Sequence, residues 1–211
     1  MRLKLAFALT VMSVAPAVAQ DKAAGPALPT GWSMRLDRTD AAAPPKFFPA
    51  GDGLHVTSGP AAIYYQPAQV MKGDFRISAT FTQTKSPQHP EAVGLFLGGK
   101  NLDGAEQEYG YLIVRGDGKY AIKHRAGAEV HTIQDWVEHA KVSKQDAAGK
   151  ATNTLLIEAI GEKVRMLING EEIRSFERRN FFPTGRMLGM RINHHLDVHI
   201  SDFKIEPISD K

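Results

Sequence analysis

"GDFRISATFTQT", residues 73–84, alternates between apolar and polar side chains. Successive side chains of an extended strand point to opposite faces, so the apolar residues all fall on one face. The apolar set is Phe75, Ile77, Ala79 and Phe81, and the polar set is Arg76, Ser78, Thr80 and Thr82. A strand with one buried and one solvated face is typical of an antiparallel sheet. This stretch therefore predicts an antiparallel sheet with a core on one side.

Short segments of strand-like composition follow one another over most of the chain, separated by turn signals. They are "WSMRL" (32–36), "GLHVTS" (53–58), "AIYYQ" (62–66), "AVGLFLGG" (92–99), "EYGYLIVR" (108–115), "KYAIKHR" (119–125), "EVHTIQ" (129–134), "TNTLLIEAI" (152–160), "KVRMLI" (163–168), "EEIRSF" (171–176), "MLGMRIN" (187–193) and "LDVHISDFKI" (196–205). The turns Gly116–Asp117–Gly118 and Asn169–Gly170 contain residues that tolerate positive φ. No long amphipathic helix separates the strands, which excludes parallel βαβ folds. The sequence predicts an all-β fold, a two-sheet antiparallel β-sandwich or jelly roll, as a single domain over residues 31–208.

The histidine-rich segment "INHHLDVHISDF", residues 192–203, is interpreted as the last hairpin of a sheet. Its turn is expected at His194–His195. A β-bulge is expected near Ser201–Asp202, where the alternation changes phase. Three polar residues would share the outward face of this hairpin: Arg191, Asp197 and His199.

The order of histidine and aspartate in this segment resembles a set of metal ligands. On an extended strand, however, His195 and His199 would lie about 13 Å apart, too far to bind one metal ion. A pair formed by Asp197 and His199 could bind metal only with a residue of a neighbouring strand. The sequence therefore predicts a solvated hairpin and no metal site.

The N-terminal residues, "MRLKLAFALTVMSVAPAVAQ", have the features of a secretory signal peptide. A short basic start precedes an apolar run, and Ala17–Val18–Ala19 forms an A-x-A cleavage site. The apolar run is too short for a membrane anchor. We expect residues 1–19 to be removed and residues 20–30, rich in alanine and proline, to form a disordered leader. The protein is thus expected to be soluble in the periplasm or outside the cell.

Composition narrows the classes of partner. The net charge of the 211-residue chain is +3 at pH 7, and loss of Arg2 and Lys4 with the signal peptide leaves +1 (3 − 2). A nearly neutral domain is a poor candidate for binding nucleic acid. No later segment has the roughly eighteen consecutive apolar residues of a membrane span. The chain has no cysteine, so neither disulfides nor a lipid-modified cysteine are expected, and no feature of the sequence sets the oligomeric state.

The order of the motifs resembles the concanavalin A-like lectin/glucanase superfamily, especially bacterial laminin-G-like and 3-keto-disaccharide-hydrolase-like jelly rolls. The motifs are "GDFRISATF", "GLFLGG", "YGYLIVRGDGKYAIKHR", "TNTLLIEAIGEKVRMLINGEEI", "GRMLGMRI" and "LDVHISDFKI". The resemblance covers residues 31–207. Its most specific parts are Asn153-x-Leu155, the Leu-x-Asn-Gly turn and G-x-x-x-G-M-R. It implies two curved sheets and a concave face that binds sugars in relatives.

The catalytic motif of family 16 glucanases, Glu-x-Asp-x-x-Glu, is absent. The nearest spacing is Asn101, Asp103 and Glu106, and an amide at the first position cannot act as the nucleophile. Glu106 and Glu108 remain weak catalytic candidates. They would lie about 7 Å apart on one face if the strand began early enough.

Sugar binding requires aromatic planes and planar hydrogen-bonding groups on one surface. Tyr109 and Tyr111 would share one face of their strand, whereas His124 and Arg125 would lie on opposite faces of the next one. Trp136 would begin a long polar connection, residues 135–150, and either rim a cleft or pack on the sheet. The candidate ligand-binding residues are Tyr109, Tyr111, His124, Arg125, Trp136, Arg191 and His199. For each of them core packing or a solvated sheet face is the alternative.

The oxygen-rich loops at residues 101–108 and 115–119 could supply ligands for calcium. Neither has EF-hand spacing, and Asp117 is also favoured by the turn itself. No cofactor is expected, with calcium as the open alternative. The sequence leaves three functions: a carbohydrate-binding protein that uses its concave sheet, a glycoside or 3-keto-glycoside hydrolase of the same fold, and an envelope protein-interaction module.

Overall fold

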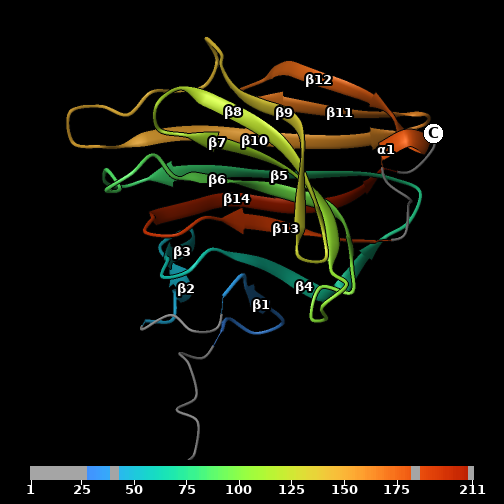
Figure 1. Cartoon of the computed structure of the whole chain (residues 1–211), viewed down its shortest axis with the longest axis horizontal. Helices are drawn as coiled ribbons and strands as arrows, with labels where there is room; N and C mark the ends of the chain where they lie inside the picture. Colours follow the sequence, from blue (N-terminus) through green and yellow to red (C-terminus); the bar gives the residue numbers. More distant parts are fainter. Residues whose placement is uncertain (1–27, 39–42, 182–185, 209–211) are drawn as a thin grey trace, which may run out of the picture.

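The computed structural model describes residues 28–38, 43–181 and 186–208. The predicted signal peptide, residues 1–19, and most of the predicted leader lie outside these ranges. The described chain forms two antiparallel sheets of seven strands each, which pack face to face (Figure 1). The predicted two-sheet β-sandwich is confirmed.

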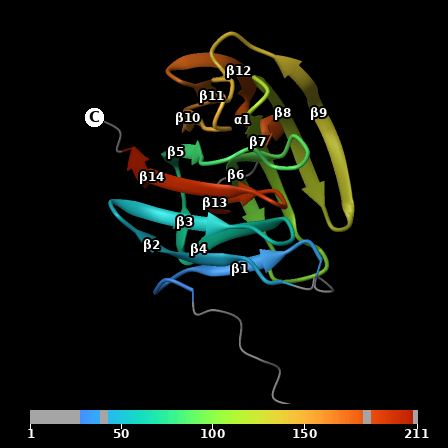
Figure 2. The same ribbon diagram turned by 90° about the vertical axis from the view of Figure 1, so that its left-hand side faces the viewer.

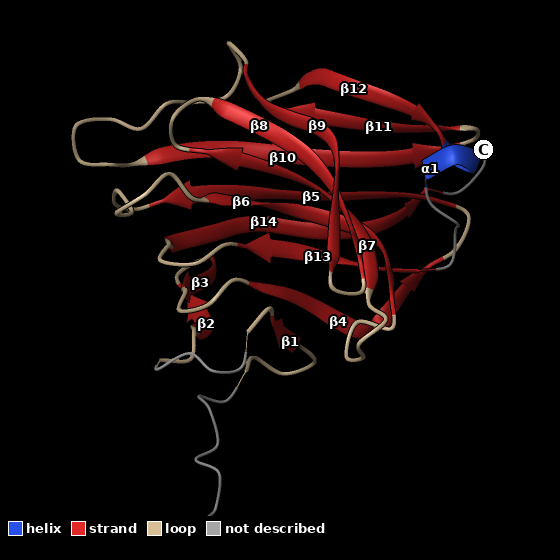
Figure 3. Ribbon diagram, viewed as in Figure 1, coloured by secondary structure: helices blue, strands red, loops and turns tan. Residues whose placement is uncertain are grey.

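In sheet A the strands lie in the order β1 (Ser33–Leu36), β4 (Ala62–Met71), β13 (Arg186–Ile192), β6 (Ala92–Lys100), β7 (Glu108–Arg115), β8 (Lys119–Ala126) and β9 (Glu129–Glu138). In sheet B the order is β12 (Glu171–Glu177), β11 (Lys163–Ile168), β10 (Ala151–Ile160), β5 (Asp74–Gln83), β14 (Asp197–Ile208), β3 (Gly53–Thr57) and β2 (Lys46–Ala50). The described part of the chain has one helix, the single turn α1 (Arg178–Phe181), seen beside the strands in Figure 3. None of the described helical structure is long and apolar enough to cross a membrane.

The main core lies between the two sheets, as the alternation predicts. In β5 every second side chain is buried, and Ile77 and Ala79 are fully inaccessible. The intervening residues face outward, where the hydroxyl of Thr80 hydrogen-bonds that of Thr154 on β10 at 2.8 Å. Burial of one face and solvation of the other therefore place β5 near the middle of sheet B.

Both predicted turns are present. The β7–β8 turn contains Gly118 with φ of 86°, and the β11–β12 turn contains Asn169 and Gly170 with φ of 49° and 83°. Positive φ is strained for most residues, and Asn and Gly tolerate it best. Each turn connects two adjacent antiparallel strands of the same sheet, the first in sheet A and the second in sheet B.

The prediction of a final hairpin is wrong, because β13 belongs to sheet A and β14 to sheet B. The turn at His194–His195 lies where it was predicted, but it carries the chain from one sheet to the other. At its end the backbone N–H of Leu196 donates to Ser58 Oγ at 2.7 Å. Alternation cannot distinguish a hairpin from this crossing, because strands of both sheets direct apolar side chains to the same core. The predicted bulge is confirmed: the pairing of β14 with β5 shifts register between Ser201 and Lys204.

The predicted long connection beginning at residue 135 is also wrong in part. β9 extends to Glu138, so Trp136 lies within a strand. β9 is the edge strand of sheet A, at the opposite edge from β1 (Figure 2), and most of its side chains are exposed. A strand exposed on both sides has no apolar alternation, which is the signal that sequence reasoning uses.

Candidate functional site

The outer face of sheet A, turned away from sheet B, carries a second buried cluster. Side chains on such a face usually meet water, but Phe96, Tyr109 and Tyr111 are only 0%, 1% and 5% exposed. Leu102, in the β6–β7 connection, packs into the same cluster, and its carbonyl accepts a hydrogen bond from Arg35 Nη1 at 3.1 Å. We call this set the outer cluster: Ile63, Tyr65, Ala92, Phe96, Leu102, Tyr109, Tyr111, Ile113 and Ala121, with Trp136 and Met187 packed against it. The two predicted tyrosines thus lie on one face, but they are buried.

A glycine of β13 makes this packing fit. A Cβ at Gly189 would lie 2.2 Å from the carbonyl oxygen of Tyr64 and 2.6 Å from the ring of Phe96. The absence of a side chain therefore lets the Phe96 ring lie close against the sheet. This glycine is the second one in the G-x-x-x-G-M-R motif, and the motif's arginine is Arg191.

Arg191 is the polar centre of the outer face. Its guanidinium forms two hydrogen bonds to the carboxylate of Asp37, from Nη1 at 2.7 Å and from Nη2 at 2.5 Å. Nη1 also donates to Tyr109 Oη at 3.2 Å, and Nε donates to Asn193 Oδ1 at 3.3 Å. The guanidinium lies 5.8 Å from the centre of the Tyr111 ring. Arg191 is 6% exposed, so the two-pronged contact with Asp37 neutralises a buried charge.

The environment shifts several pKa values on this face. Burial acts to raise the pKa of Asp37, but hydrogen bonding to Arg191 and its positive charge outweigh burial and lower it. Burial raises the pKa of Tyr109, and it raises that of Tyr111 to about 12. At neutral pH the face therefore holds an ionised Asp37, a charged Arg191 and neutral tyrosines.

Trp136 lies beside the outer cluster and is only partly buried. The Arg115 guanidinium is 4.2 Å from the centre of its ring, and the Lys123 Nζ is 5.7 Å from it. Arg115 is held in place by Asp117, which accepts from Nε at 3.1 Å and from Nη2 at 2.5 Å. We call Trp136, Arg115 and Lys123 the Trp136 cluster. It presents an aromatic plane with two cations at a partly open surface.

Arg125 belongs to the same face. It pairs across β7–β8 with Tyr109, donates from Nε to the Gly127 carbonyl at 2.9 Å, and its charge helps to lower the pKa of Asp37. Five of the candidate residues are therefore brought together on the outer face of sheet A: Tyr109, Tyr111, Arg125, Trp136 and Arg191.

His124 and His199 are not part of this group. His124 lies on the opposite face of β8, where its ring stacks on His131 at 5.9 Å and its Nε2 is 3.7 Å from Glu108 Oε1. His199 lies on the outer face of sheet B. The prediction that His199 and Asp197 share a face with Arg191 is therefore wrong, because the crossing at His194–His195 places them on opposite sides of the sandwich.

Glu106 and Glu108 do not form a facing pair. Glu106 is exposed in the β6–β7 connection, whereas Glu108 begins β7 and approaches His124. Glu108 and Tyr109 are successive residues of a strand and point to opposite faces. The structure therefore does not place Glu108 on the outer face of sheet A.

The outer face of sheet B holds a different polar cluster. His199 Nε2 is 3.2 Å from Asp52, and His55 Nε2 is 3.1 Å from Asp197. Lys85 and Thr84 also contact Asp197. Among the described residues, no group of three or more histidine, cysteine or acidic side chains has the geometry of a metal site.

Sequence reasoning missed two members of the outer face, Arg35 and Asp37. Both come from the segment around β1, far along the chain from Arg191. A single charged residue just after a short strand gives no local signal. Only the pairing of β1 with β4, and of β4 with β13, brings this segment to the site.

The protein resembles known proteins in structure rather than in sequence. No family model and no curated protein sequence matches the chain. The carbohydrate-binding module CBM66 from Bacillus subtilis superposes with a TM-score of 0.62 and 12% identity, covering 84% of this chain and 96% of that one. Alginate lyase A1-II′ superposes with a TM-score of 0.57 and 10% identity, covering 84% and 95%. The lumenal domain of VIP36, in a form bound to Ca²⁺ and Man3GlcNAc, gives 0.55 and 7%, covering 86% and 85%.

The chain has a concanavalin A-like jelly-roll fold. The resemblance predicted from the sequence is thus confirmed for the fold. A shared fold does not define an activity, so the function of this jelly roll must be inferred from its own residues.

Two cavities of this jelly roll are small. One, of about 190 Å³, lies between the β5–β6, β7–β8 and β9–β10 connections and includes Asp117, the partner of Arg115. The other, of about 270 Å³, is lined by residues of β4, β6 and β13, with the cations Lys100 and Arg186. Pockets for small molecules usually have about 300–1,000 Å³. Neither of these two cavities has the volume of an ordinary small-molecule pocket.

Proposed function

We propose that the protein is an exported carbohydrate-binding protein that holds a glycan on the outer face of sheet A, over the Trp136 cluster. The observation that carries the proposal is the partly buried Trp136 ring with Arg115 fixed 4.2 Å from its centre. Sugars are bound by aromatic planes that contact their C–H faces and by oriented polar groups that bond their hydroxyls. Trp136 offers the part of its ring that the Arg115 guanidinium leaves uncovered, and the doubly held Arg115 offers oriented donors.

The arrangement beneath the cluster favours binding without large rearrangement. Arg191 is locked by Asp37 and Tyr109, and the outer cluster supports the ring of Trp136. A preordered surface loses less conformational entropy when it binds a ligand. The names of two neighbours in structure, a carbohydrate-binding module and a protein in a Man3GlcNAc-bound form, also support this function. In this proposal residues 1–19 direct export, and the mature protein works in the periplasm or outside the cell.

The test is a glycan array with the mature chain, followed by titration of each glycan that binds. Trp136→Ala should weaken binding at least about tenfold, because the main apolar contact with the sugar is lost. The matched control is Phe48→Ala, which removes an exposed aromatic ring from sheet B and should leave binding unchanged. An array without any specific glycan would overturn the proposed function. Binding that survives Trp136→Ala but is lost in Phe48→Ala would place the ligand on the other sheet.

A further inference from the structure

The outer face of sheet A holds cations that lack an acidic partner. Arg35 and Arg125 donate to backbone carbonyls, those of Leu102 and Gly127, and Lys123 lies beside the Trp136 ring. Among the described residues, none of these three cations has a carboxylate oxygen within 4.0 Å. The face therefore presents positive charge that no carboxylate of the described residues contacts.

Two other arginines of this face are neutralised in place. Arg191 is paired with Asp37, and Arg115 with Asp117. Asp103, in the β6–β7 connection, is a further carboxylate on this side, and its charge acts on Tyr65.

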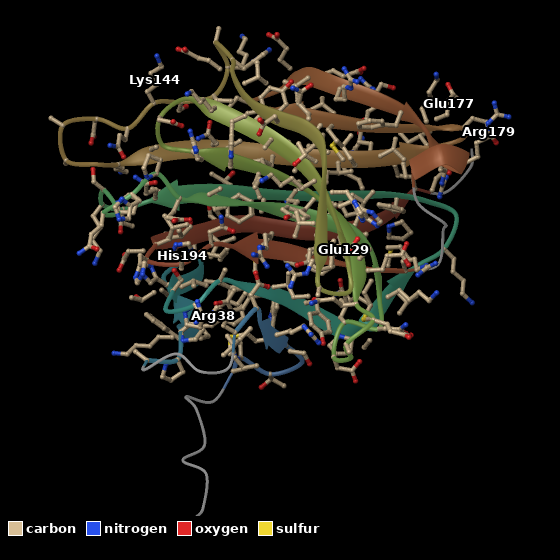
Figure 4. The ribbon with its side chains drawn as sticks, in the orientation of Figure 1. Arg38, Glu129, Lys144, Glu177, Arg179 and His194 are labelled. Atoms are coloured by element: carbon tan, nitrogen blue, oxygen red, sulfur yellow. The ribbon has the colours of Figure 1, made fainter. Side chains whose placement is uncertain are left out.

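Several cations elsewhere in the molecule are paired with carboxylates. On sheet B, Arg76 and Arg165 share Glu158. Lys144 pairs with Glu138 of β9 at 2.6 Å, and Glu177 pairs with Lys163. The labelled side chains of Lys144 and Glu177 project outward in Figure 4. These paired cations, unlike Arg35, Lys123 and Arg125, have a carboxylate of the described chain within 4.0 Å.

The unpaired cations are only partly accessible to water. Arg35, Lys123 and Arg125 are each half-buried, and the Nε of Arg35 is fully buried without a hydrogen-bond partner. A buried donor without an acceptor is costly, and partly desolvated cations attract anions more strongly than exposed ones do. Arginine also presents a fork of donors that matches a carboxylate.

We propose that the glycan bound on this face is acidic, with carboxylates of its sugar units received by Arg35, Lys123 and Arg125. The inference rests on the proposed function, because it specifies the ligand of the same surface. Sugar rings would lie over Trp136, and their carboxylates would reach the cations on β1 and β8.

The experiment compares polygalacturonate with its methyl ester, which has the same backbone but capped carboxylates. The mature chain should bind the acid at least about tenfold more tightly than the ester in low salt, and added salt should reduce the difference. Lys123→Gln and Arg125→Gln should each weaken binding of the acid by roughly tenfold, and by more than they weaken binding of the ester. The matched controls are Lys204→Gln and Arg174→Gln, which remove exposed cations from sheet B and should leave both affinities unchanged.

The possible results distinguish failure of the acidic-ligand proposal from failure of the proposed glycan-binding function. Equal binding of acid and ester, or specific binding of neutral glycans alone, would overturn the acidic ligand and leave the proposed function standing. If no glycan of any kind binds, both proposals fail. Binding of duplex DNA or dextran sulfate as tightly as polygalacturonate would show attraction to any polyanion and would overturn the assignment to carboxylated sugars.

Discussion

The burial of Arg191 in the structure differs from what its position in the strand pattern suggests. The strand pattern places it outward, where solvent is the ordinary expectation. In the structure it is 6% exposed and forms a bidentate ion pair with the carboxylate of Asp37. A buried cation that loses its only anion is strongly destabilising, whereas an exposed ion pair contributes little.

Asp37→Asn should therefore lower the free energy of unfolding by about 3 kcal/mol, because it leaves Arg191 buried without a counter-ion. Urea denaturation monitored by circular dichroism measures the loss. The pKa of Asp37 is lowered in the folded state, so its contribution is present above the unfolded value of 3.8 and is lost as pH falls through the folded value. The gap between wild type and variant should thus narrow in acid.

The control for that change is Asp52→Asn. Asp52 also contacts a basic residue, His199 at 3.2 Å, but its side chain is 84% exposed. Its substitution should alter stability by less than about 0.5 kcal/mol. Equal effects of the two substitutions would contradict the assignment of Arg191 as a buried charge.

Tyr111 should make stability fall at high pH. Burial raises its pKa from 10.0 to about 12. Between these values the unfolded chain binds fewer protons at this residue than the folded chain, so rising pH favours unfolding. Tyr111→Phe removes this linkage. Its stability should decline less than that of wild type between about pH 9 and pH 11, by about 1 kcal/mol, as measured by urea denaturation at each pH. Parallel declines would show that Tyr111 ionises normally.

At the scale of elements, the two asparagines of the most specific sequence motif turn out to be in contact. Asn169 Nδ2 donates to Asn153 Oδ1 at 2.9 Å and to the Lys141 carbonyl at 2.6 Å. Asn153 Oδ1 also accepts from the backbone N–H of Ser143 at 2.8 Å. The asparagines thus attach the β9–β10 connection to β10 and to the β11–β12 turn.

Asn153→Ala should release this connection, because Ser143 and Asn169 lose their acceptor. The expected cost is about 1–3 kcal/mol, since Asn153 is 3% exposed. Trypsin should then cleave after Lys141 or Lys144 faster than in wild type, which mass spectrometry of a limited digest would detect. Thr152→Ala, a change at an exposed neighbour, should cost less than half as much. Unchanged cleavage in the Asn153 variant would refute the attachment.

The sequence predicted correctly the strands that have one apolar and one polar face, and it failed for strands without such a division. β5 alternates over its full length and was predicted with its faces. β9 has few buried side chains, so its second half was interpreted as a loop and Trp136 was misplaced. The segment after Ile192 was predicted with the right turn and faces but the wrong partner strand, because alternation records only the direction of the core.

At the scale of the whole molecule, the main core and the outer cluster are made by the same strands. In β7 the outward Tyr111 and the inward Leu112 are consecutive, and each is buried on its own side. Neither cluster can lose its packing while that strand stays in place. The two clusters should therefore unfold together.

The two tryptophans allow unfolding of the main core and unfolding of the outer cluster to be followed separately. Trp32 packs in the main core against Phe47 and Phe203, both at 5.1 Å, and Trp136 packs on the outer cluster. Fluorescence of the Trp32→Phe and Trp136→Phe variants should give urea transitions that coincide with circular dichroism of the same protein. A lower midpoint for the Trp136 signal alone would mean that the outer cluster melts by itself.

The sequence by itself determined the strands, their turns and the side of each strand that is apolar, because these depend on neighbours along the chain. It also named five residues that the structure gathers on one face. Only the tertiary structure decided which sheet each strand joins and what covers the outer face of sheet A. Asp37 meets Arg191 across 154 residues, and Arg35 meets Leu102 across 67. Such contacts leave no periodic signal, since they arise when strands distant in sequence pair and bring single side chains together.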